Sequence, residues 1–163
     1  MIRSYQLGDH EAISEIFPIA IHEIASEVYT QEKCNAWSEK RPNPERWERR
    51  CEVKRPFVFV SQGEIAGFLE LDPDGHIDWM YVHPDHKQKG IASRLIDHAV
   101  KTSSDAGLSR VFVDASICAK PVFDKKGFRV IEEKTVEIRG ENLINFAMEL
   151  QLTNAEQDVP PNA

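Results

Sequence analysis

Two side chains that can exchange protons stand two residues apart in the stretch HIDWMYV. If this stretch is a strand, alternation places His76 and Asp78 on one face, together with Met80 and Val82. An imidazole titrates near neutral pH and suits general base catalysis, while Asp78 could orient that ring, act as the base itself or attract a cation. Glu70, on the preceding predicted strand, is a third candidate base. The alternative is a solvated polar pair at the start of a strand.

A second candidate site is the loop VHPDHKQKGIA, which leads into a predicted helix. The first N–H groups of a helix have no partner within it, and together with the helix dipole they attract anions. Gly90 allows close approach of the backbone, and Lys87 and Lys89 add positive charge for a diphosphate, unless they are ordinary surface lysines. The phosphate-binding pattern GxxxxGKS/T is absent from the chain, and of the dinucleotide pattern GxGxxG only Gly90 is in place.

Length and composition limit the classes of protein to which the chain can belong. It has 163 residues, 41% of them hydrophobic, and a formal net charge of −7, so we expect one domain over residues 1–152 and a disordered tail over residues 153–163. No run approaches the roughly 20 apolar residues of a membrane span, and no signal peptide is visible, which predicts a soluble cytoplasmic protein. The acidic charge argues against binding to nucleic acid or to a membrane. The three cysteines and six histidines show no metal-ligand spacing, so we expect no metal.

The periodicity of apolar residues predicts the elements that must position these groups. A short strand at the N-terminus precedes a helix that begins near Asp9, and one further helix with a loop is expected between Cys34 and Arg55. The remaining prediction is a hairpin around Gln62-Gly63, the strand 76–82, a helix from Ile91 to Gly107, the strand RVFVDA, a short helix ended by Gly127, and a hairpin around Arg139-Gly140. This order predicts an α/β fold whose mixed, mostly antiparallel sheet has helices on both faces.

The stretch MYVHPDHKQKGIASRLIDHAV resembles the acetyl-CoA pyrophosphate motif of the GNAT superfamily of N-acetyltransferases, with the pattern Gln/Arg-x-x-Gly-x-Gly/Ala. Here the pattern reads Lys87-Gln88-Lys89-Gly90-Ile91-Ala92, with a lysine in the first position. Downstream, AKPVFDKKGF resembles the second signature of the family, a helix that ends in Tyr-x-x-x-Gly-Phe. The chain is most similar to small bacterial GNAT proteins, and the resemblance implies a GNAT-type sheet and transfer of an acetyl group from acetyl-CoA directly to a primary amine in a ternary complex.

The resemblance also implies a set of cofactor contacts. Backbone groups of Met80, Tyr81 and Val82 would pair with the pantetheine arm as an added strand does. The N–H groups of Gln88, Lys89, Gly90, Ile91 and Ala92 would hold the diphosphate next to Lys87, and Ser116 stands where the family often has an asparagine near the cofactor.

Phe123 replaces the tyrosine that many GNAT enzymes use as general acid. The candidates for a substitute acid are Tyr81, Tyr29 and Cys118, and the alternative is that the thiolate of coenzyme A leaves without an acid. This replacement keeps open a second hypothesis, a non-catalytic regulatory module that binds CoA or acyl-CoA. A binder of that kind has no need for the pair His76 and Asp78 near the thioester.

The helices after the first strand line the acceptor site in this superfamily. In this chain they carry Tyr29 and Trp37, which could hold an amine by cation–π contact or belong to the core. The basic run ERWERRCEVKR could bind an acidic acceptor or the 3′-phosphate of the cofactor, or form a solvated helix face. The expected partners are thus acetyl-CoA and an amine acceptor, with a homodimer left open.

Overall fold

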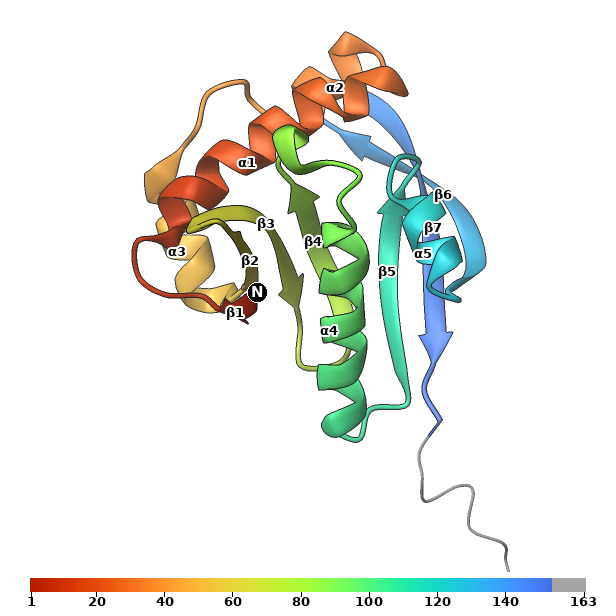
Figure 1. The fold of residues 1–163 in the computed structure, drawn as a ribbon. Coiled ribbons are helices and arrows are strands. Elements are labelled where there is room, and N and C mark those ends of the chain that lie inside the picture. The colour runs from red at the N-terminus through yellow and green to blue at the C-terminus, as the bar shows by residue number, and fades with distance from the viewer. Residues whose placement is uncertain (154–163) are drawn as a thin grey trace, which may run out of the picture.

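A seven-stranded mixed sheet forms the centre of the computed structural model, which describes residues 1–153 (Figure 1). In the order β1-β2-β3-β4-β5-β7-β6, every neighbouring pair is antiparallel except β4 with β5. The strands are β1 (Ile2–Ser4), β2 (Phe57–Ser61), β3 (Glu64–Leu71), β4 (His76–Val82), β5 (Arg110–Ser116), β6 (Arg129–Ile138) and β7 (Glu141–Gln151). The predicted fold class is confirmed. The predicted tail, apart from residue 153, lies outside the described residues.

Helices cover both faces of the sheet. They are α1 (Asp9–Glu23), α2 (Gln31–Trp37), α3 (Pro44–Lys54), α4 (Ile91–Asp105) and α5 (Lys120–Lys125), with short 3₁₀ turns η1 (Ala25–Glu27) and η2 (Pro84–His86). Phe68 of β3 packs in a core with α1 and α3, while the next residue, Leu69, packs in a core with α4. Because successive side chains of a strand point to opposite faces, these helices lie on opposite sides of the sheet.

Between α1 and β2 the chain forms two helices, α2 and α3, where the sequence predicted one helix with a loop between Cys34 and Arg55. The Thr30 side chain accepts a hydrogen bond from Lys33 N at the start of α2, and Asn43 caps α3 by accepting from Arg46 N. Pro44 occupies the first turn of α3, where its missing N–H costs nothing. The two capping residues therefore define where α2 and α3 begin, and the periodicity of apolar residues did not show that these are separate helices.

Both predicted hairpins are confirmed at their turns. Gln62 and Gly63 have φ angles of 52° and 79°, and Arg139 and Gly140 have φ angles of 48° and 83°. Two consecutive positive φ angles match the twist of antiparallel strands. Among residues 1–153, none of the helices has the length and apolar character that crossing a membrane requires.

Candidate active site

A β-bulge interrupts β4 opposite Glu70. Leu69 pairs with Met80 but Leu71 pairs with Ile77, so the register between β3 and β4 shifts by one residue. Two residues of β4 therefore lie opposite the single residue Glu70.

The bulge separates side chains that were predicted to share a face. Asp78 pairs with Lys54 of α3, and His76 contacts Asp72, which binds the same lysine. Met80 and Val82 pack instead against the core that α4 completes. The prediction that all four β4 side chains share one face is wrong for Met80 and Val82, because strict alternation has no place for an extra residue.

Strands β4 and β5 diverge after two residue pairs, His76 with Phe112 and Ile77 with Val113 (Figure 1). Two cavities follow, a large cavity of about 780 Å³ and a small cavity of about 240 Å³. The residues that line both are Trp37, Met80, Tyr81, Ser116 and Ala119. The two cavities thus meet beside the part of β4 that has no β5 partner.

Most of the predicted cofactor contacts line the large cavity. They are Met80, Tyr81, Val82, Lys87, Gln88, Gly90, Ile91, Ala92 and Ser116. Lys89 is exposed and does not line this cavity, and Phe123 lines the small one. Sequence reasoning missed the opposite wall, which Ile21 and Ala25 form, because nothing local to these apolar residues distinguishes a cavity wall from core.

The loop at the mouth of the large cavity has the backbone of an anion site. Gln88 and Gly90 have φ angles of 62° and 76°. The first hydrogen bond of α4 runs from Arg94 N to Gly90 O at 3.0 Å, so the N–H groups of residues 91–93 have no acceptor within the helix. The Lys87 ammonium lies 3.7 Å from Glu27, and both side chains are more than half exposed.

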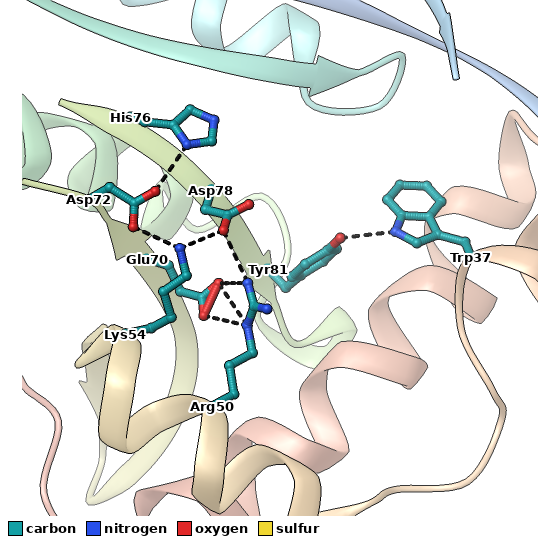
Figure 2. Close-up of polar contacts among 8 residues, drawn as sticks. All are labelled: Trp37, Arg50, Lys54, Glu70, Asp72, His76, Asp78 and Tyr81. Atoms are coloured by element: carbon teal, nitrogen blue, oxygen red, sulfur yellow. Dashed lines mark hydrogen bonds and ion pairs between the residues drawn. The ribbon is translucent and has the colours of Figure 1, made fainter. Parts of the chain in front are cut away.

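Tyr81 stands where the two cavities meet. Its hydroxyl accepts a hydrogen bond from Trp37 Nε1 at 3.1 Å (Figure 2). Burial raises the pKa of this phenol, so at neutral pH it keeps its proton. The phenol is therefore a hydrogen-bond donor at the junction.

His76 lines the small cavity and is held by Asp72. Its Nδ1 lies 3.1 Å from Asp72 Oδ2, and its ring stacks on Phe112. Hydrogen bonds from Lys54 and His76 outweigh the effect of burial and hold the pKa of Asp72 below its ordinary value. The ionised carboxylate can only accept, so Nδ1 carries a proton in either state of the ring, and Nε2 is the nitrogen that can take up or release one.

The sequence offered Asp78 as one residue that could orient His76, and Asp72 was missed. The stretch LDPDGH indicated this contact, because Asp72 and His76 flank a tight turn and residues in such positions lie opposite each other. Asp72 N donates to His76 O at 2.8 Å, which closes the β3–β4 turn.

Asp78 and Glu70, the other two candidate bases, are bound in an ion network with α3 (Figure 2). Arg50 binds the buried Glu70 carboxylate through two nitrogens, Nε at 2.8 Å and Nη2 at 2.6 Å, and Nη2 also reaches Asp78 at 3.2 Å. Lys54 Nζ lies 2.7 Å from Asp78 and 2.7 Å from Asp72. Burial raises the pKa of the Glu70 carboxyl, and Arg50 opposes that rise. Glu70 has no exposed surface, which sets it apart from His76 as a candidate base.

The remaining candidates have mostly structural partners. The Tyr29 hydroxyl donates to Ile144 O and accepts from Ile117 N, both at 2.9 Å, so its proton is already engaged. Ser116 Oγ accepts from Ala119 N at 3.2 Å. Phe123 is 1% exposed and packs edge-on against Phe128.

Cys118 lines the large cavity, and burial raises the pKa of its thiol, which disfavours the nucleophilic thiolate. Within residues 1–153, no three His, Cys, Asp or Glu side chains are grouped as metal ligands would be.

Comparisons with known proteins point to one family. The model of an acetyltransferase (GNAT) domain matches residues 25–151. The chain is 32% identical over 147 residues to "Uncharacterized N-acetyltransferase YafP" of Escherichia coli K12, across 90% of this chain and 93% of the relative.

Solved structures share the fold. One described as "GCN5-Related N-acetyltransferase: Aminotransferase, Class-II", from Rhodopseudomonas palustris, has a TM-score of 0.86 and 30% identity, and covers 93% of this chain and 95% of its own. YncA of Salmonella typhimurium, solved with its cofactor acetyl-CoA, has a TM-score of 0.72 and 20% identity, over 100% of this chain and 98% of its own.

Proposed function

Because the chain belongs to the GNAT family of acetyltransferases, we propose that it transfers the acetyl group of acetyl-CoA directly to a primary amine in a ternary complex. The divergence of β4 from β5 beside two adjoining cavities is the observation that carries this proposal. It gives the cofactor and the amine separate entrances to one meeting point. Family membership supports an acyltransferase over the non-catalytic CoA-binding module.

The large cavity accommodates the cofactor in this proposal. The free N–H groups at the start of α4 bind the diphosphate, with Lys87 adding positive charge. Beyond the last β5 pair, the inner edge of β4 near Met80 and Val82 is free to bond the pantetheine amides as an additional strand would. The thioester then lies where the two cavities meet.

Tyr81 stabilises the negative charge that develops at this meeting point. Its hydroxyl accepts from Trp37, which leaves its own proton for the thioester oxygen or the departing sulfur. The phenol pKa lies above its ordinary value of 10.0, whereas a thiol titrates near roughly 8.5. A thiolate is thus too weak a base to remove this proton, so Tyr81 acts as a hydrogen-bond donor and not as a general acid.

His76 is the general base in this proposal. Asp72 holds Nδ1–H, so Nε2 can take a proton from the amine. His76 and Met80 are four residues apart, roughly 13 Å along an extended strand. The proton therefore crosses the small cavity of about 240 Å³ through water, for which there is room.

The proton balance needs no residue at Phe123. The ammonium form of the acceptor loses one proton before attack, and the C–N bond forms as a tetrahedral intermediate. That intermediate loses a second proton from nitrogen while the C–S bond breaks. One proton goes to the thiolate and the other to solvent through His76, which gives the amide, free CoA and one released proton.

We also place the reaction in the cytoplasm, within a single domain over residues 1–152. The three cysteines are free thiols, two of them buried, which fits a reducing compartment.

Thiol release with a panel of primary amines tests the proposal. We expect acetyl-CoA to raise the melting temperature, some amine to accelerate thiol release, and initial velocities to fit intersecting lines, as a ternary complex requires. His76→Gln should lower kcat about a hundredfold while the affinity for acetyl-CoA stays unchanged. Asp72→Glu should retain more activity than Asp72→Asn, because a carboxylate still holds the ring. His98→Gln, on α4 outside the cavities, is the matched control.

No acceleration by any amine would refute the enzymatic proposal. Parallel velocity lines together with an inactive Cys118→Ala variant would refute direct transfer and favour an acyl-enzyme. Normal kcat in His76→Gln would move the base elsewhere.

A further inference from the structure

A third cavity of about 280 Å³ lies beside the small cavity, among α1, α2, α3 and the β6–β7 turn. The chain has three tryptophans, and Trp37, Trp47 and Trp79 all line this cavity. Phe17 stacks on Trp79 with ring centres 4.9 Å apart and completes an aromatic wall.

The charge of this aromatic cavity is opposite to that of the whole protein. Arg41, Arg46 and Arg139 line it, and within residues 1–153 none of the three has a carboxylate in ion-pair distance. Arg50 lines it too, but its Nε and Nη2 are bound to Glu70 and Asp78. Among the described lining residues, Glu39 carries the one carboxylate. In a chain of net charge −7, three exposed guanidinium groups that have no ion-pair partner among the described residues and line one hollow favour an anion there.

The three cavities are neighbours, with the small cavity next to both of the others. Trp37 lines all of them, and Trp79 and Ile138 line both the small and the third cavity. The third cavity shares only Trp37 with the large one. The arginines thus lie closer to the amine side of the reaction centre than to the loop before α4.

We infer that the third cavity binds an anionic group of the acceptor, so that the substrate is a small primary amine that also carries a carboxylate or phosphonate. This inference rests on the proposed acetyl transfer and specifies its substrate class. The amine lies in the small cavity facing the thioester, while Arg46 and Arg139 bind the anion at the far end and the tryptophans enclose the apolar part between them. The 3′-phosphate of the cofactor is the competing ligand for these arginines.

Matched pairs of amines test the inference by turnover. 4-(Aminomethyl)benzoate is compared with benzylamine, and 3-aminopropylphosphonate with propylamine, at saturating acetyl-CoA, because both anionic members carry an apolar part between the amine and the anion. We expect kcat/KM to be at least about tenfold higher for the anionic member of a pair, because the free energy of one charge-assisted hydrogen bond corresponds to a factor of that size. Arg46→Gln and Arg139→Gln should each remove about tenfold of this preference, mainly through KM. Arg49→Gln, on the same helix but outside the cavity, is the matched control.

Tryptophan fluorescence provides a readout that needs no turnover, because every tryptophan of the chain lines this cavity. The anionic amines should change the emission of the native protein, and the titration should weaken in Arg46→Gln and Arg139→Gln. The affinity for acetyl-CoA should be unchanged in both variants.

Each result supports or overturns a separate statement. Equal turnover of neutral and anionic amines, or binding that ignores both substitutions, overturns the inference and leaves acetyl transfer standing. Weaker acetyl-CoA binding in the variants assigns the arginines to the cofactor phosphate and also overturns it. Arginine-dependent binding of an anionic amine, without acetylation of any amine, supports the anion site and refutes the proposed reaction.

Discussion

Replacement of Arg50 by methionine tests whether the buried carboxylate of Glu70 depends on its ion pair. Glu70 has no exposed surface and receives hydrogen bonds from two nitrogens of Arg50. Removal of one partner of a buried pair leaves an uncompensated charge, which costs about 3 to 5 kcal/mol. For a chain of this length that corresponds to a fall in melting temperature of about 6 to 20 °C.

The loss should depend on pH in a direction set by Glu70. Burial already raises the pKa of this carboxyl above its ordinary 4.5, and the guanidinium opposes the rise. Without Arg50 the folded-state pKa is higher still. A raised folded pKa gives stability that is full below the unfolded value and is lost as pH rises through the folded value. Arg50→Met should therefore lose more stability at pH 8 than at pH 5. The difference is about 1.4 kcal/mol for each pH unit between 5 and 8 that lies below the raised folded-state pKa of Glu70.

Urea denaturation at several pH values, on the full chain, measures this effect. The double variant Arg50→Met with Glu70→Gln should recover most of the loss, because no buried charge remains. Arg49→Met, an exposed neighbour, should stay within about 0.5 kcal/mol of the native protein. A loss below about 1 kcal/mol in Arg50→Met, a loss independent of pH, or no recovery in the double variant would each refute the reasoning.

Three further substitutions, two of them with a matched control at Gly63, probe the cavities and the turn before β4. Gly90→Val and Gly63→Val both force a side chain into a left-handed backbone conformation, and each should lower the free energy of unfolding in urea by about 1 to 2 kcal/mol. Only Gly90→Val should also weaken acetyl-CoA binding, about tenfold or more by calorimetry. Equal affinities of the two variants would argue against the loop as the diphosphate site. Tyr81→Phe should lower kcat about tenfold or more with little change in the Kd of acetyl-CoA, and an unchanged kcat would remove the hydroxyl from the reaction. Gly75→Ala should destabilise the fold more than Gly63→Ala, because its Cβ would collide with the carbonyl oxygen of Arg110; equal melting temperatures for the two would contradict this.

The parts of the fold that sequence predicted are those that depend on local chemistry. Gly63 and Gly140 each mark a two-residue turn, and both turns form as expected. Gly90 marks the start of α4, because a glycine, which tolerates positive φ, directly precedes apolar residues at helical spacing. The division between α2 and α3 was also readable, since Asn43-Pro44 is a typical helix start.

The bulge in β4 and the ion network depend on residues that are distant in the chain. Asp78 lies 28 residues from Arg50, and Glu70 lies 20 residues from it. No periodicity within β4 shows that two of its residues will lie opposite one residue of β3, since that register is set by pairing between strands. The candidate bases were thus found by residue type, but their states required the tertiary structure. The same holds for the third cavity, whose arginines come from α3, from the loop before it and from the β6–β7 turn.

The buried Glu70 has an explanation in the shape of the acceptor side. Arg50, fixed by this carboxylate, lies 3.5 Å from the centre of the Trp79 ring, and Trp79 lines both the small and the third cavity. The bulge brings Asp78 to the same guanidinium, so one cation is held from two points of the sheet. Two anchors fix the plane of a guanidinium better than one, because its donors form a rigid fork. A charge that is costly to bury therefore holds the tryptophan wall along which the acceptor must lie.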